Sequence, residues 1–321
     1  MRRVSDVLQT TLERTYAEII SMAKPCVKCM AKTPTTRVIE GSLYLRHDAP
    51  YAHDIRVHEL GHGHTEVTIA PRYGWSEVDS LSPQAHHDYL EQLLHPPELT
   101  PLEVLENAAR SRDNSTQRAK TNVRRLIKSK NLNQMLTLTY ADNVTDRDTH
   151  HRNFDVFIKR VKRLLPRFEY VVTHERQERG AWHSHIAVHK ILPVYWFKGT
   201  LVKSYDVMRH LWRSSHTSGG AVRASRCHEG GRKRNVSFIA SYLAKYIGKD
   251  IGEEVPRYGN TYSSSLGRPP APIVFCSLHP DLWGAICEAH DLIGPDVATS
   301  RLFEKHLVDK GVYFMSASPV S

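Results

Sequence analysis

The chain has 321 residues, of which 40% are hydrophobic and 24% charged, a composition typical of one large or two ordinary globular domains. Its formal net charge of +10 indicates a polyanionic partner, nucleic acid before an anionic membrane surface. No apolar run approaches the roughly 20 residues of a membrane-spanning helix, and no secretory apolar segment follows the N-terminus, so we expect a cytoplasmic protein without a membrane partner.

Residues 1–103 are expected to form a smaller N-terminal accessory region. Apolar residues at helical spacing predict a helix over 4–22, and short alternating runs predict a few strands within 33–72. The five cysteines are too scattered for a disulfide framework. However, Cys26 and Cys29 form half of a zinc site that His58 and His62 would complete. Structural Zn²⁺ would then hold the region together, and free thiols are the alternative.

Residues 104–130 are predicted to form a strongly basic helix. A solvated helix face is the ordinary interpretation of such a charge run. Because the segment precedes elements suited to handling phosphate, we expect contact with a nucleic-acid backbone instead. The residues expected to make this contact are Arg118, Lys120, Arg124, Arg125 and Lys128.

Residues 131–280 are expected to form an α+β domain with a central antiparallel sheet and packed helices. Strands are predicted over residues 135–140, 168–174, 181–190, 221–228 and 273–278. Helices are predicted over residues 149–165, 204–215 and 235–249, and a turn over 177–180 joins two strands into a hairpin. Residues 281–321 are expected to form a C-terminal helical tail.

The hairpin contains a candidate metal site. His183 and His185 are two residues apart in a predicted strand, so their imidazoles point to the same face. The tight turn brings Glu175 level with them on the neighbouring strand. Two imidazoles and a carboxylate suit Mn²⁺ better than Mg²⁺ and leave positions open for a phosphate oxygen. A chance pair is the alternative, since the chain has 20 histidines.

The helix over 235–249 contains a candidate nucleophile. Tyr242, Lys245 and Tyr246 form a stripe beside its apolar face. A tyrosine hydroxyl can act as a covalent nucleophile, and a lysine can hold a phosphate oxygen. An ordinary packing helix with tyrosines at its edge is the alternative. The basic residues nearby that are expected to contact DNA are Arg232, Lys233, Arg234 and Lys249.

Three motifs in this order are similar to those of a known family. Thr137-Leu-Thr-Tyr, Glu175 with His183-Ser-His185, and Tyr242-Leu-Ala-Lys-Tyr246 resemble the HUH endonucleases, the rolling-circle replication initiators of single-stranded DNA phages and small plasmids. The resemblance covers about 131–265 and is closest to the initiators of microviruses and filamentous phages. Ser184 stands where the family usually has a bulky hydrophobe. That position faces the helices behind the sheet, so we expect the serine to cost packing.

The resemblance implies a metal-dependent enzyme that nicks and joins single-stranded DNA at a replication origin. Glu175, His183 and His185 would hold Mn²⁺ or Mg²⁺, which polarises a phosphate oxygen. Tyr242 or Tyr246 would attack phosphorus to form a 5′-phosphotyrosyl link, and Lys245 would steady the phosphate. The helicase and polymerase would be separate proteins of the bacterial host, because the sequence has no Gly-x-x-x-x-Gly-Lys-Ser/Thr loop.

Two other functions stay open at this point. His58-Glu59-Leu60-Gly61-His62 matches the zinc-metallopeptidase pattern, which requires a helix. The glycine within the motif and the one directly after it disfavour that helix. A non-enzymatic DNA-binding regulator would explain the positive charge equally well, although it has no use for the histidine pair or the two tyrosines.

Overall fold

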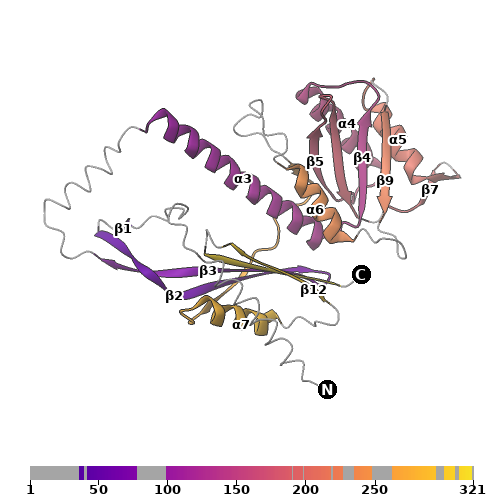
Figure 1. Cartoon of the computed structure of the whole chain (residues 1–321). Coiled ribbons are helices and arrows are strands. Elements are labelled where there is room, and N and C mark those ends of the chain that lie inside the picture. Colours follow the sequence, from indigo (N-terminus) through magenta and orange to yellow (C-terminus); the bar gives the residue numbers. More distant parts are fainter. Residues whose placement is uncertain are drawn as a thin grey trace, which may run out of the picture.

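The computed structural model contains two antiparallel sheets that are linked by one long helix (Figure 1). The structure describes residues 36–39, 42–77, 99–189, 191–197, 199–217, 220–226, 235–247, 262–293, 300–307 and 311–319. The predicted helix over 4–22, both N-terminal cysteines, the basic loop over 232–234 and residue 249 lie outside these ranges.

The central sheet has five strands in the order β10-β5-β6-β4-β9, and every neighbouring pair is antiparallel. Alternating apolar residues, such as those of Met135-Leu-Thr-Leu-Thr-Tyr140, form these strands because successive side chains point to opposite faces. The strands are β4 (Gln134–Tyr140), β5 (Tyr170–Arg176), β6 (Trp182–Val188), β9 (Gly220–Arg226) and β10 (Tyr262–Ser264). The predicted α+β class with a central antiparallel sheet is confirmed.

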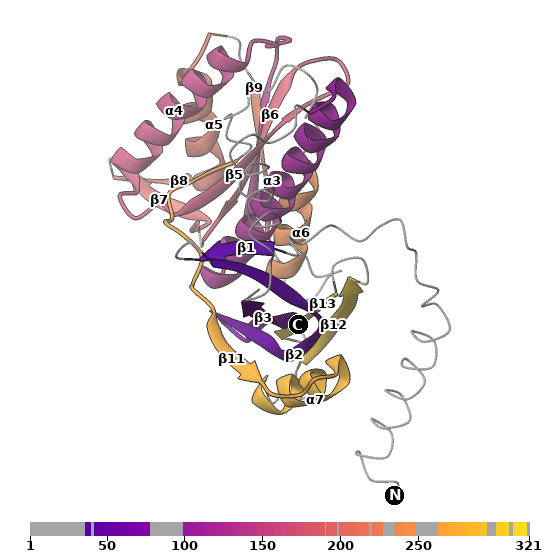
Figure 2. The same cartoon turned by 90° about the vertical axis from the view of Figure 1, so that its left-hand side faces the viewer.

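Helices cover both faces of the central sheet (Figure 2). One face packs against α4 (Arg147–Leu164) and α5 (Ser204–Ser214), where Phe157 and Trp212 are fully buried. The other face packs against α3 (Pro101–Ser129) and α6 (Val236–Tyr246). A two-stranded sheet of β7 (Val194–Phe197) and β8 (Thr200–Lys203) precedes α5 and was not predicted.

The second sheet has six strands and combines both ends of the described chain. Its main order is β1-β2-β3-β13-β12, and β11 pairs with β2. Helix α7 (Leu282–Ile293) covers one face, where its apolar side packs on β2, β3 and β13. The strands are β1 (Thr36–Ile39), β2 (Ser42–Gly61), β3 (His64–Glu77), β11 (Ile273–Ser277), β12 (Ser300–Leu307) and β13 (Val312–Pro319).

This second sheet corrects two predictions for the C-terminal part of the chain. The strand expected over 273–278 exists as β11, but it pairs with β2 and not with the strands of the central sheet. The helical tail expected over 281–321 is wrong beyond α7, because β12 and β13 form a hairpin there. Their alternating residues satisfy the open edge of β3, a partner that lies far away in the sequence.

Helix α3 joins the two sheets through a buried charge cluster. Glu66 of β3 contacts Arg125 Nε at 2.9 Å and Lys128 Nζ at 3.0 Å, and Lys128 Nζ also donates to Ser316 Oγ at 3.1 Å. The neighbouring Val123, Leu126 and Ile127 of α3 pack into the core cluster of the central sheet. The C-terminal half of α3 therefore has a charged side against one sheet and an apolar side against the other (Figure 1).

Candidate active site

The β5–β6 hairpin brings the predicted metal-ligating residues to one face of the central sheet. Glu175 lies directly opposite His183 in the antiparallel register, and His185 lies opposite Thr173. Opposed residues share a face, as do residues two apart along a strand. Ala187 on the same face packs in the cluster formed with α3 and α6, so the three side chains face the tyrosine helix.

His185 is held at both ring nitrogens. Its Nε2 lies 3.0 Å from Glu175 Oε2, and its Nδ1 lies 3.3 Å from Thr137 Oγ1. Thr137 stands directly opposite His185 in the β4–β6 register, which gives the threonine-rich first motif a physical role. Contacts on both nitrogens fix the orientation of the imidazole.

His183 is buried, and its Nε2 has no hydrogen-bond partner among the residues that the structure describes. Burial, with smaller contributions from nearby His185 and Arg179, lowers the pKa of His183 to about 4, and Glu175 opposes the shift. The imidazole is therefore neutral near neutral pH, which is the form that binds a metal ion. A buried nitrogen without a partner costs free energy, and a bound cation would remove that cost.

The donor set fits a divalent cation by its chemistry. One carboxylate and two imidazoles are ligand types that suit Mn²⁺, and one imidazole nitrogen lacks a partner within the described ranges. Within those same ranges, no three His, Cys, Asp or Glu side chains converge as a metal centre. Glu175 and His185 contact each other directly instead.

Helix α6 presents both tyrosines to His185. The Tyr246 ring stacks on the imidazole with centroids 4.5 Å apart and planes at 17°, whereas Tyr242 meets it edge to face at 5.5 Å. The two phenol rings lie 5.0 Å apart. The helix is fixed at its start by Asn235, whose side chain accepts a hydrogen bond from the backbone nitrogen of Phe238 at 2.8 Å.

The environment of Tyr246 favours the protonated phenol. Burial raises the pKa of Tyr246, and a hydrogen bond with Tyr242 and the negative charge of Glu175 raise it further. A phenol must lose its proton to act as a nucleophile, so the site has to stabilise the phenolate during the reaction. Lys245 is exposed on the same helix, where a phosphate can reach its ammonium group from solvent.

Ser184 belongs to a buried polar cluster on the opposite face of the sheet. Its Oγ lies 3.0 Å from His174 Nδ1 and 3.1 Å from His150 Nε2, and these two nitrogens are 2.9 Å apart. Tyr140 completes the cluster with its hydroxyl 3.1 Å from His150 Nδ1. The expectation that Ser184 costs packing is therefore wrong, because its hydroxyl serves two buried imidazoles that an apolar side chain would leave without it.

Sequence reasoning missed both of these histidines. A signal existed for His150, which lies on the apolar stripe of α4 one turn before Phe154, and both side chains are buried. A polar residue on such a stripe requires a partner. Ser184, unexpectedly small and polar between two candidate ligands, was the residue to pair with it.

The basic residues of α3 divide into two groups. Arg118 is exposed, and Lys120 and Arg124 are partly exposed, so all three remain open to a phosphate backbone. Lys128 is only 6% exposed and is committed to Glu66. The expectation of DNA contact is wrong for Lys128, and Arg125 is largely withdrawn by its own ion pair with Glu66.

The metallopeptidase alternative is wrong, because its motif is not helical. His58 and Glu59 lie on strand β2, and His62 lies in the turn to β3 with a φ of 52°. His58 is buried with Nδ1 3.1 Å from the Pro270 carbonyl oxygen, while His62 and Glu59 are exposed. Positive φ at His62 and Gly63 is the geometry of a tight hairpin turn. The zinc site with Cys26 and Cys29 cannot be placed, since both cysteines lie outside the described residues.

None of the helices in the described part of the chain combines the length and apolarity needed to cross a membrane.

Fold and site together define a class of protein. It is an α+β domain in which a His-x-His strand and a neighbouring glutamate face a helix with two tyrosines. Residues 133–251 match the model of a family of replication-associated proteins, that of ORF2 and the gene 2 protein. The match spans β4 to α6, the elements that supply these side chains, and supports a role in the initiation of DNA replication. Neither the curated proteins nor the solved structures gave a match to the chain.

Proposed function

We propose that the protein initiates rolling-circle replication by nicking and joining single-stranded DNA at an origin through a phosphotyrosine intermediate. The observation that carries the proposal is the contact of both tyrosine rings with His185, whose Nε2 lies 3.0 Å from Glu175. A nucleophile and a candidate cation site thus share one face of the sheet. The match of residues 133–251 to a replication-associated family supports the same function.

The side chains divide the work of binding and attack. Glu175, His183 and His185 would hold Mn²⁺ or Mg²⁺, which supplies Lewis-acid polarisation of the phosphate when bound. Thr137 fixes the imidazole of His185 through Nδ1. Lys245 would bind a phosphate oxygen from the exposed side of α6 and would balance the charge that develops on it.

The covalent step exchanges one phosphate ester for another. The phenol oxygen of Tyr242 or Tyr246 forms a bond to phosphorus, and the bond from phosphorus to the 3′ oxygen of the preceding nucleotide breaks. The phenol proton is lost to solvent, and the departing 3′ oxygen takes up a proton. The released 3′-hydroxyl can prime synthesis, and its attack on the phosphotyrosine in the reverse direction joins the strand.

Two tyrosines allow two rounds of transfer at one site. While one tyrosine carries the DNA, the other lies 5.0 Å away between ring centroids and can attack the origin once synthesis has regenerated it. We propose that a separate helicase and polymerase of a bacterial host open and copy the strand in its cytoplasm. Arg118, Lys120 and Arg124 are the proposed contacts to the DNA backbone.

A labelling experiment tests the covalent step. The protein is incubated with Mn²⁺ and single-stranded origin DNA labelled at its 3′ end, and the products are separated on a denaturing gel. A 5′-phosphotyrosyl link retains the 3′ portion of the strand, so the label should migrate with the protein. DNA labelled at its 5′ end should instead give a shorter free strand.

Variants make this experiment specific. The adduct should disappear in Tyr242→Phe/Tyr246→Phe and after addition of a chelator. It should persist in Tyr313→Phe, which removes a buried hydroxyl from β13 of the second sheet. An adduct that survives in the double variant would overturn the proposal.

A further inference from the structure

Helix α6 presents a third aromatic ring in line with the two tyrosines. Phe238 lies four residues before Tyr242, which in turn lies four residues before Tyr246, so the three rings are spaced by roughly 6 Å along the helix axis. Phe238 stacks on Tyr242 with centroids 6.0 Å apart and planes at 22°. The rings therefore form a row that starts at His185 and ends at Phe238.

Phe238 does not serve the core of the protein. The apolar residues of α6 that pack on the central sheet are Val236, Ile239, Ala240 and Leu243, whereas the side chain of Phe238 is 43% exposed. Its backbone is held rigidly, because its nitrogen donates to the capping side chain of Asn235. An exposed aromatic ring on a rigid element has the properties of a stacking platform.

The ligand class follows from this position, and the inference rests on the proposed function. Unpaired nucleobases stack on aromatic side chains without strong sequence preference, because every base has a flat π-face. The strand that places a phosphate at Tyr242 or Tyr246 must continue past one end of the row. We propose that Phe238 stacks one unpaired base of the substrate strand next to the nucleotide whose phosphate is attacked.

Abasic nucleotides locate such a base directly. Binding of fluorescent single-stranded origin DNA is measured by anisotropy in the presence of chelator, so that no cleavage occurs. One base is removed at a time along the oligonucleotide. The wild-type protein should lose affinity about 5- to 100-fold at one position near the nick, the range that corresponds to roughly 1–3 kcal/mol per stacked base.

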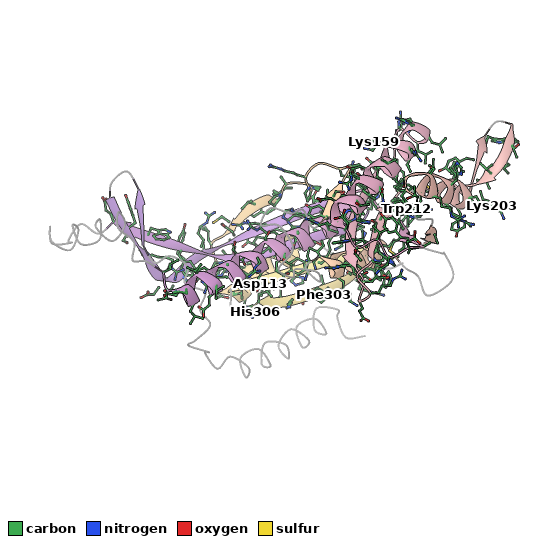
Figure 3. The ribbon with its side chains drawn as sticks, turned by 90° about the horizontal axis from the view of Figure 1, so that it is seen from above. Asp113, Lys159, Lys203, Trp212, Phe303 and His306 are labelled. Carbon is green, nitrogen blue, oxygen red and sulfur yellow. The ribbon has the colours of Figure 1, made fainter. Side chains whose placement is uncertain are left out.

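Variants of Phe238 separate stacking from general damage. Phe238→Ala should bind intact DNA more weakly by the same factor and should lose nothing further when that base is removed. Phe238→Leu keeps an apolar side chain against Tyr242 but has no π-face, so it should behave like Phe238→Ala, whereas Phe238→Trp should restore the wild-type pattern. The matched control is Phe303→Ala, since Phe303 is 58% exposed on β12, away from the central domain that contains Trp212 (Figure 3).

Three results would overturn the inference. They are wild-type affinity in Phe238→Ala, an unchanged abasic pattern in that variant, and the absence of any sensitive position in the wild-type protein. The covalent adduct is assayed in parallel on the same oligonucleotide. A position-specific abasic effect without an adduct would contradict the proposed chemistry alone, and an adduct without that effect would contradict the stacking position alone.

Discussion

Both sheets of the protein contain buried histidines, and they use them differently. In the second sheet, His53, His58 and His64 each place Nδ1 within 2.9–3.2 Å of a carbonyl or hydroxyl oxygen. In the central sheet, His183 Nε2 is buried and lacks any such partner in the described part of the chain. The motif with the stronger sequence pattern, His-Glu-x-x-His, is therefore the structural one, because its environment is strand and turn.

The two buried glutamates show the same difference. Burial raises the pKa of Glu66, but the charges and hydrogen bonds of Lys128 and Arg125 outweigh it, so the pKa lies below its usual value. Glu66 thus holds α3 on the second sheet as a paired anion. Glu175 instead contacts His185, a side chain that can itself ligate a metal ion. A carboxylate whose charge is matched by two cations of the scaffold has little capacity left for a substrate or a cofactor.

The largest expected effect comes from removing the histidines of each motif. His183→Ala/His185→Ala should reduce covalent adduct formation by about 1,000-fold or more, because Lewis-acid assistance is worth several kcal/mol. The matched variant in the second sheet, His58→Gln/His62→Asn, should leave adduct formation within about threefold by the same gel assay. Equal losses in both double variants would remove the distinction between the two motifs.

A second test compares the glutamates by stability. Glu66→Ala leaves Lys128 buried without its anion, so the free energy of unfolding in urea should fall by about 3–5 kcal/mol. Glu175→Ala should lower it by less than about 2 kcal/mol while abolishing the adduct. If Glu175→Ala destabilised the fold as much as Glu66→Ala, Glu175 would be a structural residue as well.

A third test uses pH and concerns both sheets. Burial lowers the pKa of His64 in the second sheet to about 4 and that of His150 in the central sheet to about 3. Both histidines take up a proton more readily when unfolded, so stability should be constant above about pH 6.5 and should fall as the pH decreases towards 4. The loss should reach about 2 kcal/mol per histidine near pH 5.

The contribution of one histidine can be isolated. His64→Gln should flatten the dependence of the unfolding free energy on pH by one histidine, while leaving adduct formation near neutral pH unchanged. Urea titrations at several pH values would measure both slopes. A variant slope identical to that of the wild type would show that His64 is not buried in its neutral form.

The smallest expected effect concerns the hydroxyl partners of buried histidines. Ser184→Ala in the central sheet and Ser318→Ala at His64 in the second sheet each remove one hydroxyl. Each should lower the free energy of unfolding by about 1 kcal/mol. Because Ser184 lies between two candidate ligands, only its variant should also weaken Mn²⁺ binding, measured by titration of the protein with the ion. No change in Mn²⁺ affinity would restrict Ser184 to the core.

Most elements of the central domain could be predicted from the sequence, because their signals are local. Alternation within β4 and β6 and the apolar stripes of α4 and α6 do not depend on distant residues. The strand partners could not be predicted, since the apolar run of β11 fits either sheet and only its pairing with β2 decides. The burial of Lys128 was equally hidden, because a basic helix looks the same whether or not a distant Glu66 neutralises one side of it.

The same limits apply to the candidate site. The placement of Glu175 opposite His183 follows from the length of a single turn, so the hairpin could be aligned from the sequence. The contact of Tyr246 with His185 depends on how α6 packs across the sheet, which no spacing within α6 reveals. Phe238 escaped notice for the same reason, because an aromatic residue on a helix is usually part of its core.

The arrangement of the second sheet has a consequence for the synthesis of the protein. All strands of the central sheet have emerged from the ribosome once β10 is complete, whereas β3 must wait for β13, its partner from the far end of the described chain. Domains generally fold as units during translation. The nuclease-like domain would therefore be the first to fold, while β2 and β3 stay exposed as a hairpin with open edges. Chaperone binding to nascent chains should be concentrated on that hairpin, and it should end when the last strand is added.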